Sequence, residues 1–213
     1  MISNKKLVQY LSGLSSSAGF TDRIKIRYRP LICPFGKLLS YAEKKSSVFD
    51  VGCGSGQFCA LIRRFTAVKQ IMGIEISKKL IDQAGQLNAG EERQMRFKVF
   101  DGKNIPADIQ GYELVYMIDV LHHIPLNAQQ DFLSALCEKM ASGAALVLKD
   151  IDAGSPLVIF NKIHDLIFAG ETGHERSVSL TKKMLMQAGF QLNEQFNIRT
   201  LVYPHTFFIC SRP

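Results

Sequence analysis

A chain of 213 residues with 46% hydrophobic and 21% charged side chains can bury a full core, which excludes an intrinsically disordered protein. The five cysteines have neither a disulfide framework nor a metal-ligand spacing, so we expect reduced thiols, no metal site and a cytoplasmic location. We also expect no transmembrane helix, because no run of about 18 apolar residues occurs.

The formal charge of +7 is concentrated near the N-terminus. Residues 1–46 carry nine basic and two acidic side chains, whereas residues 47–213 carry equal numbers of each. This asymmetry indicates an anionic substrate, a membrane surface or nucleic acid as a partner. We therefore predict a basic helical N-terminal extension or lid over residues 1–46 and a main domain over residues 47–213.

The extension begins with a modest amphipathic helix over residues 2–14, followed by a flexible link over residues 15–19. Residues 23–30 then alternate cations with apolar side chains, a pattern that fits an extended segment or a helix. A further helix is predicted over residues 34–46. Two interpretations of the alternating segment stay open, a solvated basic face or a lid whose cations meet an anionic acceptor: Arg23, Lys25, Arg27 and Arg29.

The main domain alternates strands with helices. One helix is predicted to be capped by Ser77 and another by Asn127. Alternation of this kind predicts a parallel sheet wound with right-handed crossovers, and two final strands joined near Thr200 predict an antiparallel hairpin. The expected fold class is α/β, a three-layer Rossmann-like sandwich with a mostly parallel seven-stranded sheet. The predicted strands cover residues 48–51, 69–76, 95–100, 111–118, 144–148, 190–199 and 201–210.

The alternation is interrupted after the fifth strand. Residues 156–169 have apolar side chains at helical spacing, residues 170–176 form a polar, glycine-rich loop, and a helix follows over residues 181–188. We therefore predict a cap insertion at about residues 155–180.

The segment from Val48 to Phe58 carries the first functional motif, in which a buried strand ends on an acid and passes through three glycines into a helix. Glycines at alternate positions allow a ligand to approach the backbone closely. A dinucleotide fingerprint requires its third glycine one position beyond Gly56, and Asp50 would repel a pyrophosphate. A sulfonium beside an amino-acid moiety would not be repelled, which favours S-adenosylmethionine over NAD.

Acids also end the strands that follow. In open parallel sheets, ligands bind beyond the carboxyl ends of the strands. Glu75, at the end of the second strand, is placed to accept hydrogen bonds from both hydroxyls of a ribose. Asp101, after the third strand, can accept one from an exocyclic adenine amine. Together, Glu75 and Asp101 predict a pocket for an adenosine. Further acids lie at the ends of other strands: Asp50, Asp119 and Asp150.

Taken together, these motifs resemble those of class I S-adenosylmethionine-dependent methyltransferases over about residues 47–210. Residues 49–56 resemble the glycine motif of that family, residues 73–77 its ribose-binding strand end, and residues 100–102 its adenine-binding turn. Residues 118–125 are similar to the motif after its fourth strand, and residues 182–190 to the helix before its terminal hairpin.

The resemblance implies S-adenosyl-L-methionine as the cofactor. It places Asp50 near the methionine amine, Glu75 on the ribose and Asp101 on the adenine amine. The full set of cofactor-binding residues that we predict is Asp50, Gly52, Cys53, Gly54, Gly56, Glu75, Ile76, Asp101, Gly102 and Asp119.

His122 and His123 are the candidate catalytic residues. Histidine is well matched to taking a proton from an acceptor near neutral pH. The spacing from Asp119 to His123 is similar to that of small-molecule methyltransferases acting on phosphorylated amino-alcohols, in which the histidine takes part in catalysis. Alternatively, one imidazole only holds the loop. His164 and His174, with Glu171 and Arg176, are either acceptor contacts or a polar surface loop.

The expected acceptor is a small molecule, acidic or lipid-like and partly hydrophobic, with O-methylation slightly preferred over N- or C-methylation. Three alternatives stay open: an RNA acceptor, peripheral membrane contact, and a regulatory protein that binds S-adenosylmethionine without activity. No recognisable RNA-binding module is present, and DNA is not expected as a partner. The sequence leaves the oligomeric state open.

Overall fold

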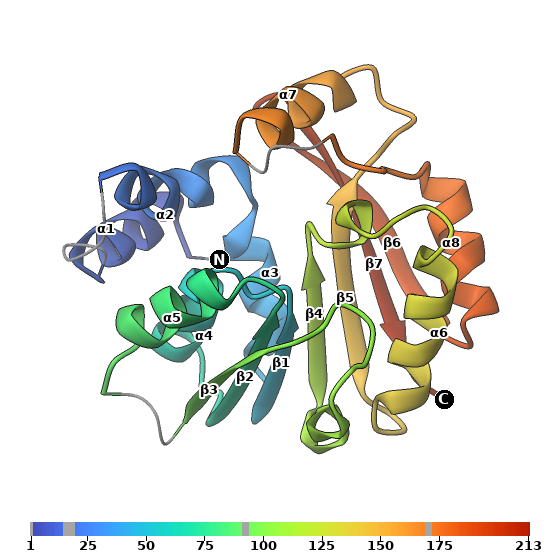
Figure 1. The fold of residues 1–213 in the computed structure, drawn as a ribbon, viewed down its shortest axis with the longest axis horizontal. Helices are drawn as coiled ribbons and strands as arrows, with labels where there is room; N and C mark the ends of the chain where they lie inside the picture. The colour runs from blue at the N-terminus through green and yellow to red at the C-terminus, as the bar shows by residue number, and fades with distance from the viewer. Residues whose placement is uncertain (1, 15–19, 91–93, 169–171) are drawn as a thin grey trace. The chain divides into compact units, whose positions relative to one another are not determined.

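The computed structural model describes residues 2–14, 20–90, 94–168 and 172–213. The chain forms two compact units, Met1–Gly102 and Lys103–Pro213. Residues 1–46 belong to the first unit. The division into an N-terminal extension or lid and a main domain, with its boundary at residue 46, therefore stays a prediction. Each unit is described by itself below and can be followed by colour in Figure 1.

In the first unit, the strands β1 (Ser47–Val51), β2 (Gln70–Glu75) and β3 (Met95–Val99) lie parallel in the order β3-β2-β1. All five residues of β1 are buried, as its position between neighbours in a covered parallel sheet requires. The register pairs Val51 with Ile74, and Glu75 with Val99. The carboxyl ends of the three strands therefore meet at one edge, where the glycine loop follows β1.

Helices pack against these strands. Ser77 is the N-cap of the helix after β2, because its hydroxyl accepts a hydrogen bond from Leu80 N at 3.3 Å, which confirms the predicted cap. Phe35 stacks on Phe58 with ring centroids 5.0 Å apart, joining the helix before β1 to the helix after it. The helices of the described part are α1 (Asn4–Leu14), α2 (Phe20–Ile32), α3 (Phe35–Ala42), α4 (Gln57–Phe65) and α5 (Lys78–Leu87).

The N-terminal extension contributes to the core of the first unit. Leu7 and Leu11 of α1 are fully buried, and Tyr10 meets Phe65 of α4 edge to face at 5.6 Å. Residues 23–30 lie in a helix, which decides between the two conformations that the periodicity left open.

The basic segment of α2 is only partly described. The predicted link over residues 15–19 and the side chains of Arg23 and Lys25 lie outside the described part. Arg27 is exposed, with its guanidinium over the Tyr28 ring at 5.3 Å. The lid role of this segment stays a prediction.

In the second unit, β4 (Leu114–Ile118) and β5 (Ala145–Ile151) are parallel, and β5 pairs antiparallel with β7 (Tyr203–Ser211), which pairs antiparallel with β6 (Gln191–Thr200). The helices α6 (Gln129–Lys139) and α8 (Val178–Gln187) contact each other beside these strands, and α7 (Val158–Phe168) contacts β7 (Figure 1). Two 3-10 turns, η2 (Ala107–Gly111) and η3 (Leu121–His123), flank β4.

These strands make the mostly parallel, seven-stranded sheet with an antiparallel C-terminal hairpin that the sequence predicted, and helices flank it. The fold class is therefore confirmed. No helix in the described ranges combines the length and the apolar character needed to cross a membrane.

Several local predictions in the second unit were wrong. The helix predicted over residues 181–188 begins earlier, at Val178. Gly111 ends the turn η2, so β4 begins only at Leu114. Asn127 does not cap α6, because a turn in which Ala128 N donates to Pro125 O at 2.8 Å makes Ala128 the N-cap. The strand β5 continues to Ile151, because that residue still pairs with β7.

Candidate functional site

The glycine loop after β1 is fixed against β2. Gly52 N and Cys53 N both donate to Ile74 O, at 2.8 and 3.0 Å. Gly56 has a φ of 72°, and a Cβ placed on it would lie 2.8 Å from Asn88 Nδ2 and 2.9 Å from Ala84 Cβ. Only glycine combines this left-handed conformation with such close packing, so the third glycine of the motif is required by the fold as well as by any ligand.

Glu75 ties the end of β2 to the glycine loop. Its Oε2 accepts a hydrogen bond from Gly54 N at 3.2 Å, and its Oε1 accepts one from Ser77 N at 3.0 Å. Two main-chain donors therefore hold the carboxylate in one orientation, and each oxygen retains further lone pairs. This geometry is compatible with accepting hydrogen bonds from a ribose, the role predicted for Glu75.

Cys53 packs against β2 rather than lining open space. A Cβ placed on Gly73 would lie only 2.6 Å from its Sγ, so glycine at position 73 makes room for the thiol. Burial raises the pKa of the Cys53 thiol far above its ordinary value. Its side chain is thus inert packing, and any contact that it makes with a ligand would use its main chain.

Asp50 is an acid in an apolar environment, with only 3% of its surface exposed. Its Oδ2 accepts a weak hydrogen bond from Cys59 Sγ at 3.4 Å. Burial raises the pKa of Asp50 to about 7, although the thiol and the positive charge of Arg29 in α2 both lower it. A cationic group near Asp50 would stabilise its ionised form.

Gln57, the first residue of α4, was missed from the sequence. Its Oε1 is buried without a hydrogen-bond partner, which is rare for a side-chain oxygen. The Gln57 oxygen lacks a hydrogen-bond donor, and Asp50 is a buried acid. Both features favour a ligand with a cationic, hydrogen-bond-donating group. The ammonium group of S-adenosylmethionine meets this requirement, so the residues of the first unit fit the predicted cofactor.

The ends of β2 and β3 carry the residues predicted for the adenine side. Phe100 N donates to Glu75 O at 3.0 Å, which joins the two strand ends. Ile76 is 65% exposed, and a Cβ on Gly102 would contact its Cγ2 at 3.6 Å. Asp101 is exposed beside them. An exposed apolar side chain next to an acid suits a flat heterocycle with an amino group, as predicted.

In the second unit, His122 and His123 lie in the turn η3 and have different surroundings. His122 is buried at 2% exposure, whereas His123 is exposed. Their ring centroids are 4.2 Å apart. His122 Nδ1 contacts Asp150 Oδ1, and His122 N donates to Asp150 Oδ2 at 3.1 Å. His122 is therefore placed to hold the turn, and His123 is the imidazole that solvent and an acceptor can reach.

Asp119, predicted to bind the cofactor, forms a partly buried ion pair with Lys149. The side chain of Lys149 is 1% exposed and that of Asp119 is 19% exposed, and Asp119 N also donates to Lys149 O at 2.9 Å. Asp119 has a φ of 56°, an uncommon conformation for a residue other than glycine. The ion pair holds this strained residue in place at the end of β4.

Two consecutive residues of β5 thus anchor the turn that follows β4. Successive side chains of a strand point to opposite faces, so Lys149 reaches Asp119 on one face and Asp150 reaches His122 on the other. The sequence predicted no role for Asp150, although this acid lies near the end of a strand. The available signal was a lysine and an aspartate within a buried strand, since buried charges are almost always paired.

The predicted cap contains a loop that is joined to α7. The carboxylate of Glu175 accepts hydrogen bonds from Asn161 Nδ2 at 3.1 Å and from Lys162 Nζ at 2.8 Å. Burial opposes ionisation, but these bonds hold the pKa of Glu175 below its ordinary value. Glu171 and the side chain of His164, named as candidate acceptor contacts, lie outside the described residues.

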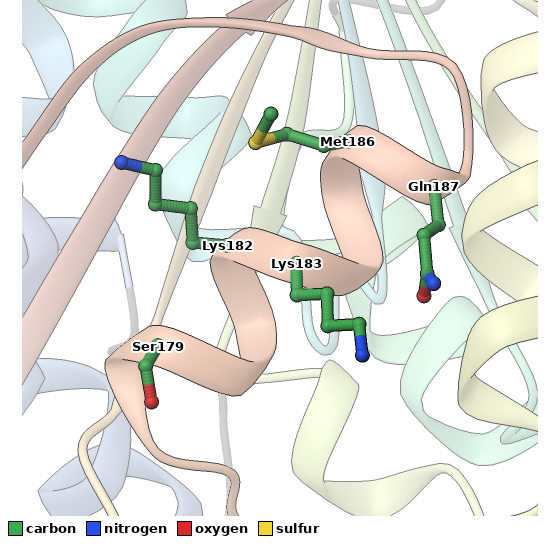
Figure 2. Close-up of a pocket in the computed structure, with 5 residues that line it drawn as sticks. All are labelled: Ser179, Lys182, Lys183, Met186 and Gln187. Atoms are coloured by element: carbon green, nitrogen blue, oxygen red, sulfur yellow. The ribbon is translucent and has the colours of Figure 1, made fainter.

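A shallow depression on α8 carries no functional assignment. Figure 2 shows that its lining side chains all come from one helix, with Lys182 and Met186 on one side and Lys183 and Gln187 on the other, so no polar groups converge on a ligand. Elsewhere in the described ranges, no group of three or more histidine, cysteine, aspartate or glutamate side chains is placed to hold a metal ion. The depression is lined by Ser179, Lys182, Lys183, Met186 and Gln187.

Comparison with known proteins agrees with this geometry. A family model described as a methyltransferase domain matches residues 25–195. The ubiquinone biosynthesis O-methyltransferase of Coxiella burnetii is 26% identical over 82 residues, which are 38% of this chain and 34% of that protein. Norajmaline N-methyltransferase of Rauvolfia serpentina is 28% identical over 109 residues, 50% of this chain and 36% of that protein. The matched region thus spans about a third of the length of these relatives.

Solved structures share the fold. The magnesium protoporphyrin IX methyltransferase of Synechocystis, solved with bound SAH, has a TM-score of 0.68 at 20% identity, covering 92% of this chain and 89% of its own. The putative methyltransferase in complex with the Trm112 activator of Haloferax volcanii has a TM-score of 0.71 at 13% identity, covering 87% of this chain and 91% of its own.

Proposed function

The chain belongs to the class I S-adenosylmethionine-dependent methyltransferases, and we propose that its acceptor is a small, partly hydrophobic molecule with an acidic group. S-adenosylmethionine supplies a methyl group already activated on a sulfonium sulfur. The task left to the protein is to bind and orient the two reactants and, where the acceptor must lose a proton, to take it up.

For the cofactor, we propose the residues that the first unit gathers at the carboxyl ends of its strands. Asp50 and Gln57 would receive the ammonium group, because one is a buried acid and the other has a buried oxygen without a donor. Glu75 would receive the ribose, and Ile76 and Asp101 the adenine. The assignment of Asp119 is less direct, because its carboxylate is already paired with Lys149.

For the acceptor, one observation carries the proposal: α7 exposes apolar side chains and is hydrogen-bonded, through Glu175, to the loop that contacts His122. A partly hydrophobic acceptor could lie on this face with its reacting group near His123, which would act as the base. The names of the relatives compared above mention ubiquinone, norajmaline and magnesium protoporphyrin IX, which supports a small-molecule acceptor. The exposed residues of α7 are Ile159, Phe160, Ile163 and Leu166.

The nature of the transfer is also part of the proposal. We infer O-methylation in preference to N- or C-methylation, because an exposed histidine can remove the proton of a hydroxyl group as the new bond forms. The +7 charge at neutral pH is compatible with an acidic acceptor, and it also leaves RNA and peripheral membrane contact as outcomes to be tested. We place the reaction in the cytoplasm.

The test uses S-adenosylmethionine labelled in its methyl group. The protein is incubated in parallel with a solvent extract of the source cells and with their total RNA, and the labelled product is identified by mass spectrometry. Label in the extract supports the proposal, and label in the RNA contradicts it. Cofactor binding by calorimetry without transfer to either pool would instead indicate a regulatory protein.

The role of α7 is tested with matched variants. Phe160→Gln should slow transfer to the extract about tenfold and leave the affinity for S-adenosylhomocysteine unchanged, because it alters only the acceptor face. Met186→Gln is the control, since Met186 is an exposed apolar residue on another helix, α8, with no connection to His122 among the described contacts. Equal rates for the two variants would remove α7 from the acceptor site.

A further inference from the structure

Gln129, at the start of α6, joins three segments of the second unit. Its side chain is fully buried. Its Nε2 donates to Leu121 O, Ile124 O and His174 O, each at 3.0 Å, and its Oε1 accepts from Arg176 Nε at 2.7 Å. The amide therefore connects its own helix to the turn η3 and to the loop of residues 172–176.

The orientation of this amide is determined by its surroundings. Three carbonyl oxygens face Nε2, and a guanidinium group faces Oε1. A flipped amide would place its oxygen against three acceptors and its NH₂ group against a donor, losing every bond. The guanidinium group of Arg176 is itself held in place, because its Nη2 donates to Leu126 O at 2.8 Å.

The two segments that Gln129 joins also touch each other directly. His174 N donates to His122 O at 2.6 Å. A Cβ placed on Gly173 would lie 2.8 Å from His122 Cδ2, so the loop lies against the buried imidazole. The same loop is fastened to α7, since Lys162 Nζ donates to Gly173 O at 3.0 Å and to the carboxylate of Glu175.

We propose that Gln129 is a positioning residue that fixes the turn carrying His122 and His123 relative to the loop of residues 172–176 and, through that loop, to α7. Two of its bonds go to Leu121 O, in η3, and to Ile124 O, directly after η3, so they lie on either side of the two histidines. Holding both sides of the turn sets the direction in which the side chain of His123 projects from the backbone. Displacing a reacting group by about 1 Å can cost on the order of 100-fold in rate.

This inference rests on the proposed function, in which the exposed histidine and α7 both act on the methyl acceptor. It adds a residue for which neither the sequence nor the comparisons supplied a role. Gln129 does not itself touch the reactants in this account. It acts on the rate through the position of the histidine turn.

The experiment compares Gln129→Met with Gln130→Met. Methionine keeps the volume of glutamine and removes its polar atoms. Gln130 is the adjacent glutamine of α6, but its Nε2 donates to Met184 O of α8 at 3.2 Å and to Ser134. Both variants lose side-chain hydrogen bonds from one helix, and only Gln129→Met releases the histidine turn.

The first readout is label transfer to the solvent extract at saturating S-adenosylmethionine. Gln129→Met should lower the maximal rate about 10- to 100-fold, and Gln130→Met less than twofold. A dilution series of the extract separates this loss from weaker acceptor binding. The affinity for S-adenosylhomocysteine should stay within twofold in both variants. A rate that falls equally in both, in proportion to their loss of thermal stability, would overturn the proposal.

The second readout needs no acceptor. Imidazole NMR signals of His122 and His123, assigned with single substitutions, should move in Gln129→Met and stay in place in Gln130→Met. Unmoved signals would overturn the proposal even if the wild-type protein transferred no label, so this result is independent of the proposed function. Should Gln129→Met fail to fold, Arg176→Gln is used instead, because it removes the donor that orients the amide and leaves Gln129 itself in place. It should move the same signals.

Discussion

The carboxylate of Asp150 contacts both the side chain and the main chain of His122. One carboxylate oxygen contacts the imidazole Nδ1 and accepts from Ile151 N at 2.8 Å, and the other accepts from His122 N at 3.1 Å. An ionised carboxylate can only accept hydrogen bonds, so we infer that His122 carries its proton on Nδ1. The contacts fix the plane of the His122 ring beside His123.

Asp150→Asn should therefore weaken the turn. The amide places an NH₂ group where only an acceptor fits, leaving a buried donor facing another donor, at a cost of about 1–3 kcal/mol. We expect a lower melting temperature and slower methyl transfer. Asp152→Asn is the control, because Asp152 is partly exposed and its carboxylate, among the described contacts, accepts from Gly154 N at 2.8 Å. If both variants melt at the same temperature, Asp150 does not hold the turn.

The pKa of Asp50 leads to a prediction about stability and pH. Burial raises it from 3.8 to about 7, so between these values the folded protein keeps a proton that the unfolded chain releases. The stabilising contribution of that proton is complete below pH 3.8 and is lost as the pH rises through about 7. Asp50→Asn removes the effect, so the variant should melt at a higher temperature than the wild type at pH 8.

The gain should amount to roughly 2–4 °C for each kcal/mol of relieved burial cost. Thermal unfolding of both proteins at pH 5 and pH 8 measures it, and the difference between them should be larger at pH 8. The same variant should bind S-adenosylhomocysteine poorly, because it lacks the carboxylate for the ammonium group. Tight binding by the asparagine variant would contradict the assignment of Asp50 to the cofactor.

Arg29 should tune cofactor binding through Asp50. Its positive charge lowers the pKa of that acid, so Arg29→Gln should leave less Asp50 ionised at neutral pH. We expect weaker binding of S-adenosylhomocysteine at pH 7, with the deficit shrinking at pH 8. Arg27→Gln serves as the control, since Arg27 is exposed over the ring of Tyr28. Calorimetry at the two pH values measures the affinity of each variant for S-adenosylhomocysteine. Identical affinities of the two variants would rule out this electrostatic effect.

The ion pair between Lys149 and Asp119 should be strongly coupled. Removing one member leaves the other as an uncompensated, largely buried charge, and we expect Lys149→Met to cost about 3–5 kcal/mol. The double variant Lys149→Met with Asp119→Asn should be more stable than the sum of the single effects predicts. A double-mutant cycle by urea unfolding measures the coupling. Additive effects would mean that the pair does not hold the strained residue.

Gly73 and Gly85 provide a matched test of the packing beneath the glycine loop. Alanine at position 73 would bring its Cβ to 2.6 Å from Cys53 Sγ, and overpacking of this kind costs about 1–3 kcal/mol. Alanine at position 85, within α5, meets nothing within 4 Å and should stabilise the helix by about 0.5–1 kcal/mol. Thermal unfolding should therefore shift in opposite directions. A neutral Gly73→Ala would show that the thiol can move aside.

The predicted cofactor residues could be named from the sequence because their signals are local. The glycine spacing, the acid ahead of the loop and the acids after β2 and β3 lie within a few residues of the strand ends that position them. The cap at Ser77 was predicted correctly for the same reason. Asn127 misled, because a turn begun at Pro125 moved the helix start by one residue.

The sequence by itself determined the mostly parallel sheet and the edge at which the candidate cofactor residues gather, because hydrophobic periodicity and strand-end residues specify them within short windows. Only the tertiary structure decided which histidine is buried, because that depends on Asp150, 28 residues away from His122. It also decided the pairing of Asp119 with Lys149 and the role of Gln129, whose amide reaches His174 across 45 residues. Contacts between residues so far apart in the chain leave no periodic trace in the sequence, and packing alone brings them together.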